Sequence, residues 1–142
     1  TEPPIVMVVE SGVVNLLADR LADANDVLQL EVLCCLTNIA AEHTEQARSV
    51  LCALPYLTAF LAGGNSAIQE QSCWVLGNLA ADSPELRASI LASGALLPLS
   101  NLLRHVSPNS PVSVLRTAAW AVSNLVRGEA MGMDQSQLGV QK

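Results

Sequence analysis

The chain of 142 residues contains few aromatic residues and little positive charge. Phe, Trp and Tyr make up 3% of the sequence and apolar residues 51%, so Leu, Val, Ile and Ala must form the core. Such side chains favour closely packed helices. Lys and Arg total 7 against 13 Asp and Glu, which gives a net charge of -6. With no basic stripe to neutralise phosphates, we expect no nucleic-acid partner, and the acidity suits a cationic ligand.

Motifs for metal binding and catalysis are also missing. The four cysteines form no CxxC pair, and His43 and His105 have no neighbours at ligand spacing. There is no glycine-rich phosphate loop, no nucleophile paired with a His by motif and no paired carboxylates. We therefore expect no enzyme, no metal and no cofactor. The thiols are expected to be buried and reduced, in an intracellular protein; they belong to Cys34, Cys35, Cys52 and Cys73.

The sequence has no membrane or export signal. No uninterrupted apolar run reaches the roughly 18 residues of a membrane helix, and no signal peptide is recognisable. We expect no membrane partner. The length suits one domain. Because the first residue, Thr1, already lies inside an apolar pattern, we expect a fragment or truncated form of a longer protein.

One helical stretch, residues 69–82 (QEQSCWVLGNLAAD), organises the chain. Its apolar residues have helical spacing, and Trp74 and Asn78 lie four residues apart, on one face. Asn is a poor residue for a helix interior because its side chain competes for backbone hydrogen bonds. An Asn beside a large aromatic residue is therefore hard to explain by folding alone.

The same pattern occurs three times. Residues 115–128 (LRTAAWAVSNLVRG) contain Trp120 and Asn124, and residues 29–42 (QLEVLCCLTNIAAE) contain Asn38, with Cys34 in the place of the Trp. The three Asn residues are 40 and 46 residues apart. We call Asn38, Asn78 and Asn124 the amide ladder.

Two short helices are expected before each long one. The long helices are predicted at 27–41, 67–81 and 112–127, the first two with Asp26 and Ser66 as N-caps. Ser-Gly breaks at 11–12 and 93–94 separate short helices, and no such break follows Cys52. This order and period predict an all-α, right-handed armadillo-type solenoid of about three stacked three-helix repeats. The predicted units are a partial first repeat (1–42), a second (43–82), a third (83–128) and a disordered tail (129–142).

The long helices are expected to line a concave groove. Helices pack about 8–10 Å apart and an extended peptide advances about 3.3 Å per residue, so each repeat would span about three peptide residues. An Asn amide can pair with a peptide's backbone N–H and C=O. The indoles of Trp74 and Trp120 can hold Lys or Arg stems through cation–π attraction.

Structural alternatives exist for each of these residues. The amide ladder can instead join stacked helices by hydrogen bonds, and the two Trp residues can pack in the core. Asp82, at the end of its helix, can cap the helix that starts near Pro84, pair with an ammonium in the groove, or do both.

Residues 2–128 resemble the importin-alpha (karyopherin-alpha) family, specifically its second to fourth armadillo repeats. The most telling matches are LTNIA at 36–40, EQSCWVLGNLAAD at 70–82 and WAVSNL at 120–125. The resemblance implies an adaptor of the cytoplasm and nucleus that binds an extended Lys/Arg-rich nuclear localisation signal of a cargo protein. The implied peptide-binding residues are Asn38, Gln71, Trp74, Asn78, Asp82, Trp120 and Asn124.

The chain departs from the family pattern in one region. Cys34 replaces a family Trp, and a family Thr that helps seat the key lysine falls on Ala47. The family's basic importin-beta-binding segment is absent, so importin-beta is expected as a partner only through a segment that this chain lacks. A second hypothesis is a diverged armadillo scaffold that binds another protein segment. Apolar stacking faces at both ends also predict self-association.

Overall fold

The computed structural model describes residues 4–127, and all regular elements in this range are helical. In chain order they are α1 (Ile5–Glu10), α2 (Val13–Arg20), α3 (Asp26–Ala40), α4 (Thr44–Ser49), the 3-10 helix η1 (Val50–Ala53), α5 (Leu54–Leu61), α6 (Ser66–Asp82), α7 (Pro84–Ala92), α8 (Leu96–Arg104) and α9 (Val112–Leu125).

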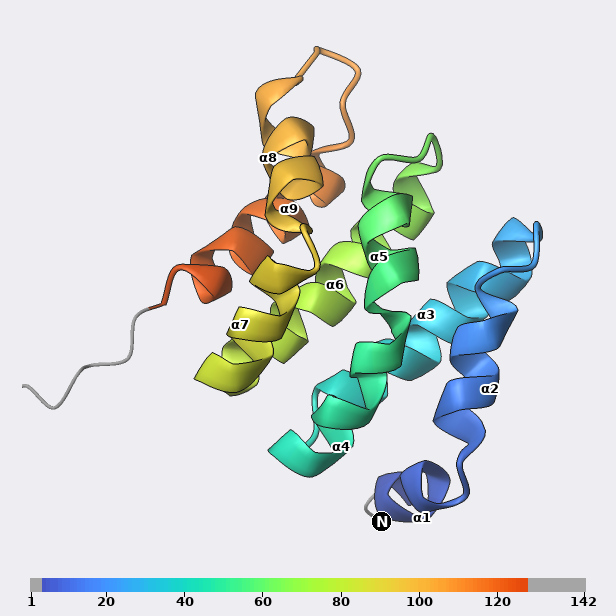
Figure 1. Cartoon of the computed structure of the whole chain (residues 1–142). Helices are drawn as coiled ribbons and strands as arrows, with labels where there is room; N and C mark the ends of the chain where they lie inside the picture. The colour runs from blue at the N-terminus through green and yellow to red at the C-terminus, as the bar shows by residue number, and fades with distance from the viewer. Residues whose placement is uncertain (1–3, 128–142) are drawn as a thin grey trace, which may run out of the picture.

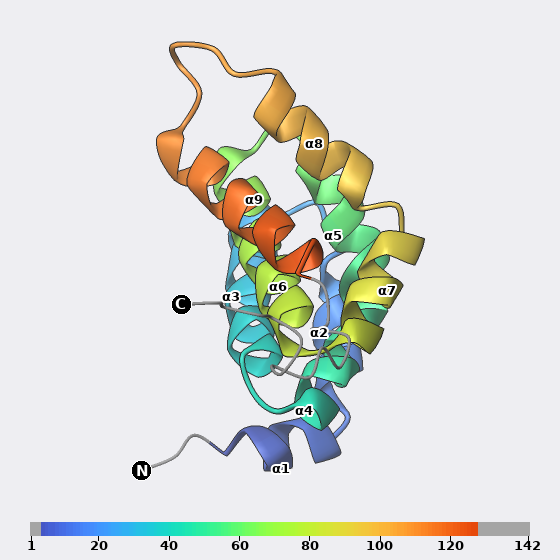
Figure 2. The ribbon, with the colours of Figure 1, turned by 90° about the vertical axis from the view of Figure 1, so that its left-hand side faces the viewer.

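The helices stack as a short solenoid of repeats (Figure 1). The long helices α3, α6 and α9 lie side by side and form one layer, with α6 in contact with both of the others. Helices α2, α5 and α8 form a second row, and α4 and α7 lie at one edge. Viewed from the α9 end, the long helices lie one behind the other (Figure 2). This arrangement confirms the predicted all-α stack of three-helix repeats.

Asparagine side chains cap the N-termini of two of the three long helices. Asn25 Oδ1 accepts from the Leu28 amide at 3.0 Å, and Asn65 Oδ1 accepts from the amides of Ala67 and Ile68. The predicted caps Asp26 and Ser66 were therefore wrong by one residue, because the preceding Asn is in an extended conformation that aims its side chain at the free amides.

The connections between the short helices differ between repeats. Gly12 and Gly94 have φ of 78° and 81°, a conformation that favours glycine and produces the predicted breaks. In the second repeat, where no Ser-Gly pair occurs, η1 leads directly from α4 into α5. The first short helix of this repeat is thus α4 followed by a 3-10 turn.

The core is aliphatic, as the composition predicts. Helix α6 supplies much of it because α3 and α9 cover it on opposite sides, which buries Cys73, Val75, Leu76, Leu79 and Ala80. A helix with neighbours on both sides must be apolar over most of its circumference. This leaves α6 one open face, the one that carries Trp74.

The third long helix is shorter than predicted and ends at Leu125. Gly128 and the predicted tail 129–142 lie outside the described residues. Among the residues described, no single helix is long and apolar enough to cross a membrane. Helices α7 and α8 pass that test only as a pair, and they are bent by 78° at the break between them.

Candidate functional site

The amide ladder joins the repeats to one another. Asn78 Nδ2 on α6 donates to the Thr37 carbonyl of α3 at 3.1 Å, and Asn124 Nδ2 on α9 donates to the Gly77 carbonyl of α6 at 3.1 Å. In both cases the acceptor residue immediately precedes the Asn of the repeat before. The alternative in which the amide ladder joins stacked helices by hydrogen bonds is therefore correct for one hydrogen bond of Asn78 and one of Asn124.

The three ladder residues differ in their access to solvent. Asn124 is 1% exposed, and its Oδ1 is buried without a hydrogen-bond partner in the described part of the chain. Asn78 is half-buried, and Asn38 is exposed. Asn38 makes no side-chain hydrogen bond within residues 4–127. Asn38 and Asn78 thus keep amide groups that a peptide can reach, whereas Asn124 is mainly part of the junction.

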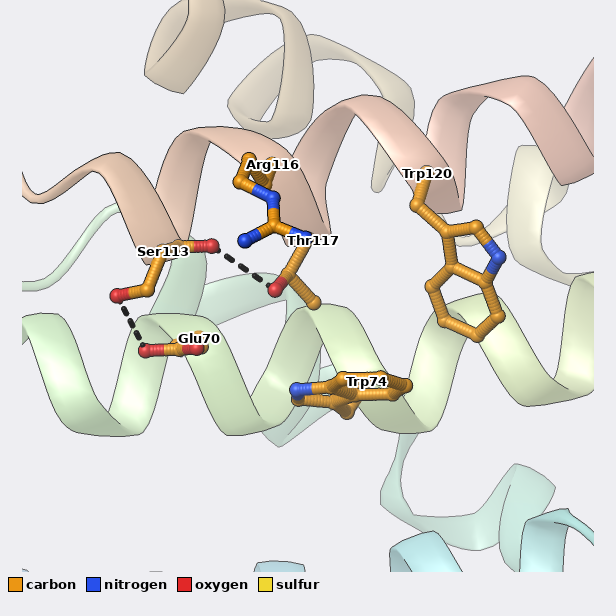
Figure 3. A pocket seen from close by; sticks show the side chains of 6 residues that line it. All are labelled: Glu70, Trp74, Ser113, Arg116, Thr117 and Trp120. Atoms are coloured by element: carbon orange, nitrogen blue, oxygen red, sulfur yellow. Dashed lines mark hydrogen bonds between the residues drawn. The ribbon is translucent and has the colours of Figure 1, made fainter.

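The two indoles contact each other. Their ring centroids are 5.0 Å apart, with 51° between the ring planes (Figure 3). Trp74 is 41% exposed and Trp120 is half-buried. Trp120 lies against α6 at Gly77, where an added Cβ would overlap its ring. Packing between the helices therefore buries Trp120 more deeply than Trp74.

A pocket of about 400 Å³ opens beside these rings, between α6 and α9 (Figure 3). The Ser113 hydroxyl donates to the Glu70 carboxylate at 2.9 Å, which holds that carboxylate at the pocket. Arg116 is exposed, and it forms no ion pair with the described residues. The pocket thus combines aromatic surface with one acid and one base. Its lining residues are Glu70, Trp74, Ser113, Arg116, Thr117 and Trp120.

Asp82 is the last residue of α6 and does not cap the next helix. Ser83 is the N-cap of α7, and its Oγ accepts from the Leu86 amide at 3.3 Å. The capping alternative for Asp82 was therefore wrong, because Ser83 takes that place. Asp82 Oδ2 is buried and has no hydrogen-bond partner among residues 4–127. A buried carboxylate oxygen without a donor is costly, so this oxygen favours a ligand cation or N–H group.

Gln71 bonds to α3. Its Nε2 donates to Thr37 Oγ1 at 2.7 Å, while the Thr37 hydroxyl donates to the Leu33 carbonyl at 2.8 Å. Thr37 thus accepts a hydrogen bond from Gln71 at its hydroxyl and another from Asn78 at its carbonyl. Sequence reasoning missed Thr37, although its place before Asn38, like that of Gly77 before Asn78, was a usable signal.

The four cysteines are free, but their burial was predicted incorrectly. Only Cys73 is buried, and burial raises the pKa of its thiol to about 12. Burial, followed by the charges of Glu31 and Cys35, also raises the pKa of Cys34. Cys35 and Cys52 are exposed, because no described element covers the helix faces on which they lie. No cluster of three His, Cys, Asp or Glu residues suited to a metal occurs among the described residues.

Comparisons with known proteins show which family shares this sequence pattern. Residues 1–41, 44–81 and 83–127 each match the Armadillo/beta-catenin-like repeat. The chain belongs to the armadillo-repeat family. It is 41% identical over 128 residues to importin subunit alpha-9 of Arabidopsis thaliana, and 37% identical over 130 residues to importin subunit alpha-1b of Oryza sativa. Each match covers 89% of this chain and 24% of the relative, so the chain spans about a quarter of the length of these proteins.

Solved structures agree on the fold. A designed armadillo repeat protein in complex with a (KR)4 peptide superposes with a TM-score of 0.78 at 24% identity, covering 85% of this chain and 50% of that one. The predicted armadillo-type solenoid of about three repeats is confirmed, as is the resemblance to importin-alpha. The family model and the relatives that match this chain are named for armadillo repeats and importin subunits, and none of these names denotes an enzyme, in agreement with the prediction that the chain is not an enzyme.

Proposed function

We propose that the groove of this armadillo repeat chain holds an extended, Lys/Arg-rich segment of another protein, of the kind that serves as a nuclear localisation signal. The similarity to importin subunits alpha supports this class of ligand, and it supports a place of action in the cytoplasm and nucleus. The net charge of -6 favours the approach of a basic partner.

The observation that carries the proposal is the Asp82 carboxylate oxygen, buried without a donor at the end of α6. Asp82 lies eight residues after the exposed Trp74, about two helical turns along α6. A ligand ammonium or guanidinium supplies the missing donor together with an opposite charge. Trp74 and Asp82 thus offer an aromatic surface and an acid at two separate points along α6, each suited to a cationic side chain of an extended segment.

The indole geometry indicates how such a side chain enters. Carbon atoms in contact lie about 3.5–4.0 Å apart, so a methylene stem between two ring faces needs roughly twice that separation. The Trp74 and Trp120 centroids are only 5.0 Å apart, so the stem lies along the open face of Trp74. Glu70 is one turn away on the same helix and faces the same pocket, so it can receive the charged end.

The amides then position the ligand backbone. Asn38 and the remaining donor and acceptor of Asn78 can pair with peptide N–H and C=O groups. These bonds do not distinguish ligand side chains and set only the register. Gln71 stays with Thr37 unless the ligand displaces it.

The test is a titration of a fluorescent Lys/Arg-rich peptide against the full chain at two salt concentrations, with an acidic peptide for comparison. We expect tighter binding of the basic peptide, weakened by salt. Asp82→Asn should reduce affinity severalfold and Asp82→Lys more strongly. Asp19→Asn, which changes an exposed acid on α2, is the matched control and should bind like the parent. Equal binding by Asp82→Lys and the parent would contradict the proposal.

Arg116 gives a reason to test the scaffold hypothesis in the same titration. Its guanidinium faces the pocket without an acidic partner among the described residues, so it favours a ligand that carries a carboxylate. With a basic ligand, Arg116→Gln should raise affinity a few-fold by removing a like charge. Loss of acidic-peptide binding in Arg116→Gln, with no basic-peptide binding in the parent, would instead favour a scaffold for acidic segments.

A further inference from the structure

The loop between α8 and α9, residues 105–111 (HVSPNSP), differs from the loops at the same place in the other two repeats. It has seven residues, against four between α5 and α6 and five between α2 and α3. In both views it reaches farther from the helices than the α5–α6 loop, at the edge of the solenoid and across the direction in which the repeats stack (Figure 1, Figure 2). A repeat stacked on this end of the chain would therefore lie beside the loop and not over its tip.

The two shorter loops are each tied to the long helix that follows. Gln29 Nε2 on α3 and Gln69 Nε2 on α6 each donate to two backbone carbonyls at the loop that precedes the helix. The spacing of 40 and 46 residues that relates the ladder amides puts Leu115 at this position in the third repeat. The Leu115 side chain has no donor, so residues 105–111 are not held to α9 in this way.

Two serines close this loop into a turn. The Ser110 amide donates to the Ser107 carbonyl at 3.0 Å, and Pro108 occupies the second position of the turn, where proline is favoured. The Ser107 amide donates to Ser110 Oγ at 2.9 Å, and the two hydroxyl oxygens are 3.3 Å apart. Ser107 is exposed and Ser110 is half-buried, so Ser107 offers the more accessible hydroxyl.

A proline follows each of these serines, which is the context that proline-directed protein kinases recognise. Proline has no backbone N–H and holds the residue before it in an extended conformation. Between Glu85 and Glu129 the sequence contains four Arg residues and no Asp or Glu, so no carboxylate of this segment repels an added phosphate. Arg104, three residues before Ser107, is exposed and forms no ion pair with the described residues, so its guanidinium can pair with a phosphate.

We propose that Ser107 and Ser110 are phosphorylation sites for a proline-directed protein kinase. Ser107 Oγ attacks the γ-phosphorus of ATP, and the new Oγ–P bond forms as the bond from that phosphorus to the β–γ bridging oxygen breaks. ADP leaves with the electron pair of the broken bond, and the hydroxyl proton passes to a carboxylate base of the kinase. Ser107 reacts first because it is exposed. Its phosphate disrupts the turn and so releases the Ser110 hydroxyl for the same reaction.

The second phosphate also changes the start of α9. Ser110 directly precedes Pro111, which is the N-cap of α9 and supplies no side-chain acceptor, whereas Asn25 and Asn65 cap α3 and α6. A phosphate on Ser110 adds negative charge and acceptor oxygens at the positive end of the helix. We therefore expect phosphorylation to raise the melting temperature of the parent chain more than that of Ser110→Ala.

The experiment is incubation of the full chain with ATP and a purified kinase that requires proline after the acceptor, followed by peptide mass spectrometry. We expect two phosphates on the parent, one on Ser110→Ala and little phosphate on Ser107→Ala, in which the turn stays closed. Replacing both Pro108 and Pro111 with Ala should abolish the reaction while leaving the hydroxyls in place. A folded parent chain that acquires no phosphate on Ser107, while a synthetic peptide of residues 102–114 is modified, would overturn the proposal.

A third Ser-Pro pair, Ser83–Pro84, is the matched control within the same chain. Ser83 is half-buried, and as the N-cap of α7 its Oγ accepts from the Leu86 amide at 3.3 Å. We expect no phosphate on Ser83 in the folded chain, although a synthetic peptide of residues 79–89 should be modified. Phosphorylation of Ser83 as fast as that of Ser107 would overturn the assignment to this loop. These measurements involve no ligand in the groove, so they can succeed or fail independently of the proposed function.

Discussion

The two junctions of the solenoid share one hydrogen-bonding scheme but differ beneath the indole. Between α3 and α6, Thr37 occupies the position before the Asn and binds Gln71 through its side chain. Between α6 and α9 that position is Gly77, and the Trp120 ring lies directly against it. Trp120 is half-buried, whereas Trp74 stays 41% exposed.

The comparison shows that one sequence motif can place its indole in two different environments. A glycine in the preceding helix lets the following indole lie on that helix and stabilise the junction. At the junction where Thr37 occupies this position, the indole of Trp74 keeps more exposed surface. The motif of Trp followed by Asn therefore does not by itself determine how deeply the indole is buried.

Removing the indoles should separate these roles most clearly. Trp120→Ala should lower the free energy of unfolding by about 2–3 kcal/mol, less than the roughly 3–5 kcal/mol of a fully buried aromatic. Trp74→Ala should cost about 1 kcal/mol because much of its ring already contacts solvent. Urea denaturation followed by circular dichroism measures both. Equal losses of stability would show that the two indoles pack alike, contrary to the comparison.

Changing Gly77 or Thr37 to Ala should destabilise the protein in both cases, but for different physical reasons. In most exposed helix positions Gly→Ala stabilises by up to about 1 kcal/mol, yet Gly77→Ala should destabilise by about 1–3 kcal/mol because the added Cβ displaces Trp120. Thr37→Ala, the matched change, adds no atoms and loses about 1 kcal/mol of hydrogen bonding with Gln71. Thermal melts compare the two, and a more stable Gly77→Ala protein would contradict the packing described for Trp120.

The ladder amides should divide between stability and binding. Asn124→Ala removes a buried hydrogen bond to Gly77 and should cost about 1 kcal/mol of stability. Asn78→Ala should cost less, since Asn78 is half-buried, but should weaken peptide binding more. Melting curves and the fluorescent-peptide titration test both expectations. If Asn124→Ala is the variant with the greater loss of affinity, the buried amide must become accessible to the ligand.

The smallest effect concerns the repeat that lacks an indole. Cys34→Trp should restore a wall for a cationic side chain and improve basic-peptide affinity by roughly 0.5–1 kcal/mol, a few-fold. Trp74→Ala should lower affinity by more than this gain, because the rest of the pocket already fits Trp74. Folding is checked first by melting, since overpacking would hide a gain. An intact Cys34→Trp protein with unchanged affinity would mean that the peptide does not reach the first repeat.

The repeat architecture could be predicted from the sequence alone. Three in-register Asn residues and the aliphatic composition were enough to predict the stacked three-helix units, because helical periodicity and turn residues act locally. The same local signals placed Trp74 and Asn78 on one face of α6. Cap positions were wrong by one residue at Asp26 and Ser66, since adjacent polar residues compete for the same free amides.

The contacts of each of these side chains depend on the tertiary structure and could not be predicted from the sequence. Four features join segments distant in sequence or depend on burial. They are the hydrogen bonds of Asn78 and Asn124 to a neighbouring repeat, the close contact of Trp120 with Gly77, the hydrogen bond of Gln71 to Thr37 and the unpaired oxygen of Asp82. Periodicity gives the face on which a side chain lies, whereas packing between repeats gives the depth and partner of that side chain. For this reason the sequence could predict a groove but not which of its residues remain free to bind.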